Sequence, residues 1–227
     1  MKKIIIMPLL ILLIVGCQHI QEPLSHSTIE WIDILMLNDI QYERHYPKPM
    51  DEDSPVIIER GQEIGQVMYK MEDRAGIHHQ MQNGHATYLE KDTAIYEIKG
   101  YPTTLLVAAN DAVYVARLNE SAKTVEELYP MRQLVKNIYI ESTEDGRRLH
   151  TFTQSAKERF LNAFYSLKLE DVELIEQEGL RIFLEIELQN GVSFRQLYWS
   201  ESNVFHNGAV GNDEIQKVIM DELSQMK

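Results

Sequence analysis

The sequence predicts an α+β protein with a mostly antiparallel β-module first, followed by an antiparallel sheet with two covering helices. Residues 28–122 are rich in short β-forming runs that Gly, Pro and Asp interrupt, as in small β-barrels and sandwiches. Residues 123–227 alternate hairpin signals with amphipathic segments of helical period. That order is typical of helices on one face of an antiparallel sheet. We therefore expect a β-rich domain over residues 28–122 and an α+β domain over residues 123–227.

The clearest hairpin of the first domain is centred on Asn110-Asp111, between the β-rich runs TTLLVAA and AVYVARL. A turn of two residues at this point pairs Val107 with Tyr114 and Leu105 with Ala116 across the ladder. The hairpin thus predicts the register of two neighbouring strands.

Turn and capping signals define the second domain. Asp145-Gly146 is a type I′ hairpin signal, and a two-residue turn there places Tyr139 opposite Phe152. Three helix starts are also predicted, two by capping-box spacing and one by an acidic residue before an apolar period: Thr124-x-x-Glu127, Ser155-x-x-Glu158 and Asp213.

The most regular strand signal is RIFLEIEL, which precedes Asn190-Gly191. A two-residue turn at that dipeptide pairs Leu184 with Leu197. Alternate apolar residues predict one buried face, made of Ile182, Leu184, Ile186 and Leu188. Glu185 and Glu187 share the other face, where we expect them to meet solvent. The alternative is that these two neighbouring carboxylates serve acid/base chemistry.

Residues 1–16 have the pattern of a secretory signal peptide. Lys2 and Lys3 give a positive start, and the run from Ile4 to Val15 contains no polar residue. A helix that spans a bilayer needs about 20 apolar residues, so this run is too short. The alternative is a short buried core helix that ends in Cys17.

The run ends in Ile14-Val15-Gly16-Cys17, which resembles the lipobox of bacterial lipoproteins. The family more often has Leu at the position of Ile14, and the resemblance covers residues 1–17 only. It implies that Cys17 receives a diacylglyceryl group on its sulfur. It also implies that signal peptidase cuts between Gly16 and Cys17.

Lipid attachment would explain why Cys17 is the only cysteine of the chain. Two acyl chains anchor a protein stably, and their attachment leaves no thiol for a disulfide. Residues 17–27 are polar and aperiodic, as in a tether that reaches about 15–20 Å. We expect the mature chain on the extracytoplasmic face of the cell membrane, bound to it through the N-terminal lipid. The chain fits a Gram-positive envelope; in a Gram-negative cell, Gln18 would favour the outer membrane by resemblance to known sorting rules.

The chain is acidic, with a formal net charge of −13. Nucleic-acid binding requires a basic face that neutralises phosphates, so no nucleic-acid partner is expected. Anionic lipid headgroups likewise attract basic segments. The predicted lipid must therefore anchor the protein without help from charge.

No standard catalytic motif occurs in the sequence, among them G-x-S-x-G, the P-loop, H-E-x-x-H and G-x-G-x-x-G. We therefore predict a non-enzyme without a cofactor. His78, His79 and His85 are weak metal-site candidates, because imidazoles bind copper and zinc. Their spacing matches no standard zinc pattern, and the alternative is an exposed connection between strands.

Two loops remain ambiguous. MDEDS, residues 50–54, is acidic but lacks the ligand spacing of a calcium loop, which favours a solvated loop. Residues 199–213 include Phe205 and His206. Long loops often carry function, but we expect Phe205 to plug the core beneath.

Two functional interpretations follow. The first is a non-enzymatic lipoprotein that contacts another envelope protein or an envelope polymer. The second is a lipoprotein that binds a small ligand between its two domains, or a metal at the histidines. Beyond residue 27 the layout resembles uncharacterised bacterial lipoproteins only.

Overall fold

The α+β fold class is confirmed by the computed structural model, which describes residues 32–47, 56–72, 79–171 and 176–226. Two sheets and three helices make up this part of the chain. The signal peptide, Cys17, the tether, His78 and the acidic loop at 50–54 lie outside the described residues. No helix within the described ranges is long and apolar enough to cross a membrane.

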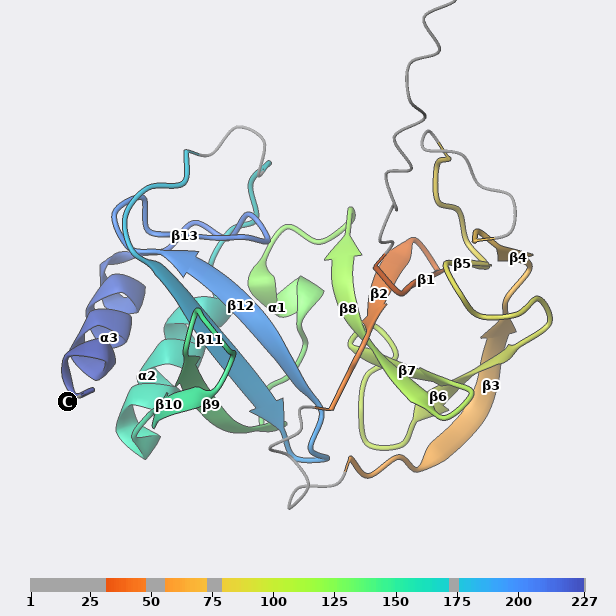
Figure 1. Ribbon diagram of the computed structural model, residues 1–227, viewed down its shortest axis with the longest axis horizontal. Helices are drawn as coiled ribbons and strands as arrows, with labels where there is room; N and C mark the ends of the chain where they lie inside the picture. The colour runs from red at the N-terminus through yellow and green to blue at the C-terminus, as the bar shows by residue number, and fades with distance from the viewer. Residues whose placement is uncertain (1–31, 48–55, 73–78, 172–175, 227) are drawn as a thin grey trace, which may run out of the picture. The chain divides into compact units, whose positions relative to one another are not determined.

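The first sheet has eight strands and curls strongly (Figure 1). Its strand order is β3-β6-β7-β8-β2-β1-β5-β4, in which only the β4–β5 pair is parallel. The strands are β1 (Ile34–Leu37), β2 (Ile40–Arg44), β3 (Arg60–Gln66), β4 (Tyr69–Lys70), β5 (His85–Ala86), β6 (Ala94–Ile98), β7 (Leu106–Ala109) and β8 (Ala112–Asn119).

The β7–β8 hairpin has the predicted register. Val107 lies opposite Tyr114, and the Ala116 amide donates to the Leu105 carbonyl at 2.8 Å. Asn110 adopts a φ of 48° in the turn, a left-handed conformation that Asn tolerates better than most residues.

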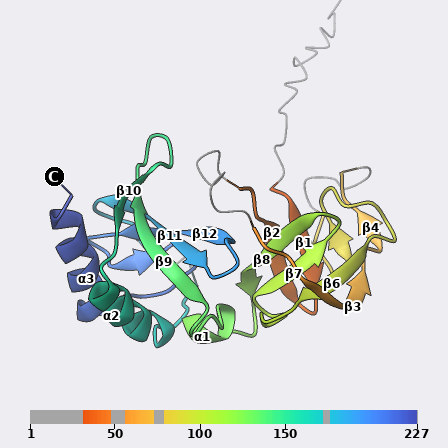
Figure 2. The ribbon, with the colours of Figure 1, turned by 90° about the horizontal axis from the view of Figure 1, so that it is seen from below.

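The second sheet is antiparallel, and its strand order is β10-β9-β11-β12-β13. Its strands are β9 (Val135–Glu141), β10 (Arg148–Thr151), β11 (Arg181–Leu188), β12 (Ser193–Trp199) and β13 (Val204–Phe205). The helices are α1 (Val125–Leu128), α2 (Gln154–Tyr165) and α3 (Asp213–Ser224). Helices α2 and α3 contact each other and lie on one face of this sheet (Figure 2). The described residues belong to one compact unit, and the division into domains at residue 122 stays a prediction.

The predicted register of the β9–β10 hairpin is wrong by one residue. Tyr139 lies opposite Thr151 rather than Phe152. The loop closes with a 2.8 Å hydrogen bond from the Ser142 amide to the Arg147 carbonyl, so it holds four residues instead of two. Next to the loop the register is shifted by two residues, and a bulge between Arg148 and His150 reduces the shift to one at Tyr139. The Ser142 hydroxyl accepts hydrogen bonds from two amides inside the loop, and this local bonding stabilises the wider turn.

The β11–β12 hairpin shows the same kind of difference. Leu184 lies opposite Gln196 rather than Leu197. The Leu188 amide donates to the Val192 carbonyl at 2.7 Å, which encloses a loop of three residues. Only Gly191 in that loop has a positive φ, 84°, as expected for a three-residue loop.

Two of the three predicted helix starts are confirmed. Thr124 and Glu127 form the expected capping box at α1, and α3 begins at Asp213 as predicted, with Asn212 as its N-cap. Helix α2, however, is capped by Thr153 instead of Ser155, because the Thr153 hydroxyl accepts the Ala156 amide at 3.2 Å.

An aromatic cluster between α2 and the second sheet forms the centre of the core. Phe160 is fully buried and lies 5.8 Å from Phe152 and 5.0 Å from Phe164, measured between ring centroids. Phe205 packs on Phe164 at 5.0 Å and is buried, so it plugs the core as predicted. The expected apolar face of β11 is buried too, at Ile182, Leu184, Ile186 and Leu188.

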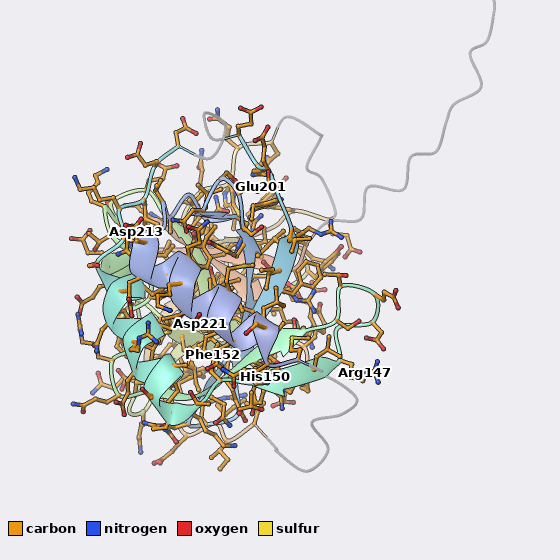
Figure 3. All side chains as sticks on the ribbon, turned by 90° about the vertical axis from the view of Figure 1, so that its left-hand side faces the viewer. Arg147, His150, Phe152, Glu201, Asp213 and Asp221 are labelled. Atoms are coloured by element: carbon orange, nitrogen blue, oxygen red, sulfur yellow. The ribbon has the colours of Figure 1, made fainter. Side chains whose placement is uncertain are left out.

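A buried glutamate ties α3 to strand β10 and to the residue that caps α2. Glu222 accepts a 3.2 Å hydrogen bond from the Thr153 hydroxyl, and its Oε2 lies 2.5 Å from Nε2 of His150. His150 and Phe152 lie beside the C-terminal part of α3 (Figure 3). This contact fixes the helix against the edge of the sheet.

Candidate functional site

The outer face of β11 is a covered layer of ion pairs, so the expectation that Glu185 and Glu187 face solvent is wrong. Both residues are 1 % exposed. Arg148 donates to Glu185 through Nε at 2.7 Å and through Nη2 at 3.1 Å. Glu187 accepts from Lys136 at 2.9 Å and from the Tyr139 hydroxyl at 2.6 Å. Long side chains from β9 and β10 thus cover the face that alternation alone assigns to solvent.

The environment of Glu187 keeps it ionised. Burial alone would raise the pKa of the Glu187 carboxyl, but hydrogen bonds from Tyr139, Lys136 and Asn137 outweigh burial and lower it. A general acid needs the opposite shift, towards neutral pH. This carboxylate therefore suits a structural role better than acid/base chemistry.

A pocket of about 460 Å³ lies between the two sheets. Its walls come from β2 and β8 of the first sheet and from β11 and β12 of the second. The cationic side chains in its lining are Arg44, Arg117 and Arg195, which are 42 %, 42 % and 43 % exposed. The volume lies in the range of small-molecule sites.

Two of these arginines are held from behind by buried carboxylates. The Arg195 Nε atom lies 2.6 Å from Glu141, whose side chain is 0 % exposed. The Arg44 Nη1 atom lies 3.3 Å from Asp33, whose side chain is 2 % exposed. Such charge-assisted contacts fix the orientation of a guanidinium group, so both arginines are preorganised.

Arg117 is held less firmly. Its Nε atom lies 3.3 Å from Glu43, and the Glu43 side chain is itself 47 % exposed. An ion pair that is open to solvent contributes little to stability. Arg117 can therefore be replaced at small cost to the fold.

Aromatic rings form the apolar part of the pocket wall. The guanidinium carbon of Arg195 lies 4.5 Å from the Phe183 ring centroid, and that of Arg44 lies 5.0 Å from Tyr46. Tyr129 contributes another ring to the wall. Apolar walls with a few placed polar groups are typical of ligand pockets.

His206 adds a neutral hydrogen-bond donor to the pocket lining. Its Nδ1 accepts the Leu197 amide at 3.2 Å, which places the proton on Nε2 in the neutral ring. Desolvation by the pocket wall and the charge of Arg117 lower the pKa of His206 to about 4. The loop at 199–213 thus supplies both the core plug and a residue of the pocket.

Sequence reasoning did not find the arginines of this pocket. The Arg195–Glu141 pair spans 54 residues and the Arg44–Asp33 pair spans 11. No local motif joins such residues, and only the tertiary fold brings them together. The sequence offers one signal for these arginines: they are positively charged in a chain whose net charge is −13.

The predicted histidine site is described only in part. His79 Nε2 lies 3.0 Å from His85 Nδ1, and the Tyr69 ring stacks on His79 at 5.3 Å. Desolvation and the neighbouring His79 lower the pKa of His85. Among the residues that the structure describes, no group of three His, Cys, Asp or Glu side chains is placed to hold a metal ion. Metal binding at these histidines stays a prediction, and His78 lies outside the described ranges.

No protein-family model matches the sequence, and no curated protein and no solved structure is significantly similar to it.

Proposed function

We propose that this protein is a lipid-anchored, extracytoplasmic binding protein that recognises a small ligand in the pocket between its sheets. The observation that carries the proposal is the combination of preorganised arginines and aromatic rings around one cavity of about 460 Å³. Preorganised groups lose little conformational freedom when a ligand binds. They are therefore what a recognition site requires.

The chemistry of the lining supports binding rather than catalysis. Arginine stays protonated in proteins, so it cannot serve as a general base at neutral pH. His206, with a pKa of about 4, is a weak base far from the range that general catalysis prefers. Contact with an envelope protein or polymer is the second candidate function, because the pocket opens on the surface and can admit a side chain or chain end.

The proposed location at the membrane rests on the lipobox. In cells, the full chain is expected to be cut before Cys17, to gain the mass of a diacylglyceryl group and to enter the detergent phase on phase separation. Cys17→Ala is expected to lose the lipid and stay in the aqueous phase. Intact-mass measurement and detergent partitioning check this. An unmodified wild-type chain with residues 1–16 intact would contradict it.

The pocket itself is tested with a panel of neutral, anionic and cationic fragments and a thermal unfolding assay. A ligand that binds only the folded state at 100 times its Kd stabilises it by about 2.7 kcal/mol, which raises Tm by about 5–10 °C in a chain of this size. At least one fragment is expected to raise Tm in the wild type and to lose that effect in Arg195→Lys.

Arg132→Lys is the matched control for this assay. Arg132 also pairs with a carboxylate, at 2.7 Å from Glu126, and stacks on a ring, at 4.5 Å from Tyr165, but it does not line the pocket. The proposal is supported if a fragment of any charge raises the Tm of wild type and of Arg132→Lys but not that of Arg195→Lys. It is contradicted if no fragment in the panel behaves in this way.

A further inference from the structure

We propose that the pocket selects an organic anion in which a carboxylate or phosphate group is attached to a planar ring. The inference rests on the proposed binding function and names its ligand class. It comes from the guanidinium groups that line the pocket, from the N–H donors that they keep beyond their ion pairs among the described residues, and from the rings beside them.

Guanidinium groups outnumber carboxylates in the pocket lining. The protein carries a net charge of −13, yet three guanidinium groups line this one cavity. The carboxylates of Asp33 and Glu141 lie behind Arg44 and Arg195 and are almost completely buried. Glu43 and Glu185 also line the pocket, so a ligand meets three guanidinium groups and two carboxylates.

Within the described part of the chain, each of these arginines has N–H donors beyond those that contact its carboxylate. A guanidinium carries five N–H donors in a planar fork. Arg44 contacts its carboxylate through Nη1, while Arg117 and Arg195 use Nε. The other N–H groups can form the paired bonds that arginine makes with carboxylate and phosphate oxygens. His206 adds an Nε2–H donor, which an anion also accepts.

The rings select for a flat apolar group next to the anion. Phe183 lies beside Arg195 at 4.5 Å and Tyr46 beside Arg44 at 5.0 Å. Tyr129 and Phe194 stand 5.1 Å apart in the same wall. Offset aromatic contacts at such spacing add to the free energy of binding, so a ring is a better fit than an aliphatic chain.

The test is calorimetric titration of the full chain, purified in detergent, with benzoate, phenyl phosphate and benzamide. Benzamide has the shape of benzoate without its charge. We expect one or both anions to bind at least about tenfold more tightly than benzamide. The relative affinity of benzoate and phenyl phosphate decides which anionic group the pocket prefers.

Variants locate the binding. Arg117→Gln is expected to weaken anion binding by about tenfold or more without loss of folding, because its partner Glu43 is exposed. Arg132→Gln is expected to leave it unchanged. Anions that bind equally well to wild type and Arg117→Gln, or no better than benzamide, would overturn the inference. If neutral fragments raise the Tm of wild type but not that of Arg195→Lys, the proposed binding function stands even when this inference fails.

Discussion

Phe160→Ala is expected to lower the free energy of unfolding by about 3–5 kcal/mol, the usual cost of removing a buried phenylalanine ring. Phe160 is fully buried, and rings of Phe152, Phe164 and Phe205 surround it. These rings come from α2, from the segment after β10 and from β13. They are held by elements that cannot collapse together, so the cavity stays open and the cost lies at the high end.

Urea denaturation of the full chain measures this loss as a lower midpoint with an unchanged slope. Leu149→Ala is the control, because Leu149 is 44 % exposed and a substitution on the surface usually changes stability by about 0.5 kcal/mol or less. A Phe160→Ala midpoint as close to wild type as that of the control would show that the aromatic cluster is not the centre of the core.

Glu187→Gln is expected to lower the free energy of unfolding at pH 7 by about 1–3 kcal/mol. The carboxylate accepts hydrogen bonds from Tyr139, Asn137 and Lys136. An amide keeps the shape but replaces one acceptor oxygen by a donor, so these bonds are not all kept.

The effect of Glu187→Gln depends on pH in a defined direction. The pKa of Glu187 is lowered in the folded protein, so its ionised form is the one that stabilises the fold. That contribution is fully present above the unfolded pKa of about 4.3 and is lost as the pH falls through the folded value. The gap in stability between wild type and Glu187→Gln should therefore narrow from pH 7 to pH 3. A gap that stays constant over this range would contradict the assignment.

Strand identity could be predicted from the sequence because period-two patterns and turn residues are local. The β7–β8 register followed from Asn110-Asp111. The registers of the other two hairpins differ from prediction because a dipeptide ending in Gly also completes loops of three or four residues; in the β9–β10 pair, a bulge between Arg148 and His150 then changes the register once more. In both loops only the glycine has a positive φ, whereas a type I′ turn needs two such residues.

Burial on the outer face of the second sheet could not be predicted in this way. Alternation in RIFLEIEL assigns Glu185 and Glu187 to solvent, but it carries no information about neighbouring strands. Arg148 and Lys136 reach over from β10 and β9. The pocket could not be predicted for the same reason: its lining residues come from several segments between Glu43 and His206, and only the tertiary fold brings them together.

The expected cellular location is predicted on a different basis from the fold and the pocket. Targeting signals are linear and are recognised in an unfolded chain, so the lipobox can be read from Ile14 to Cys17 without knowledge of the fold. The lipid anchor and the membrane location stay predictions until the mass of the mature chain is measured.

The most direct test of the central claim follows the arginine Nε–H signals by NMR during a benzoate titration of the full chain. The pocket assignment predicts saturable shifts of the Arg44, Arg117 and Arg195 signals, with the Arg132 signal unchanged. If all four signals move alike, or if none of the three pocket arginines moves, the pocket is not the binding site.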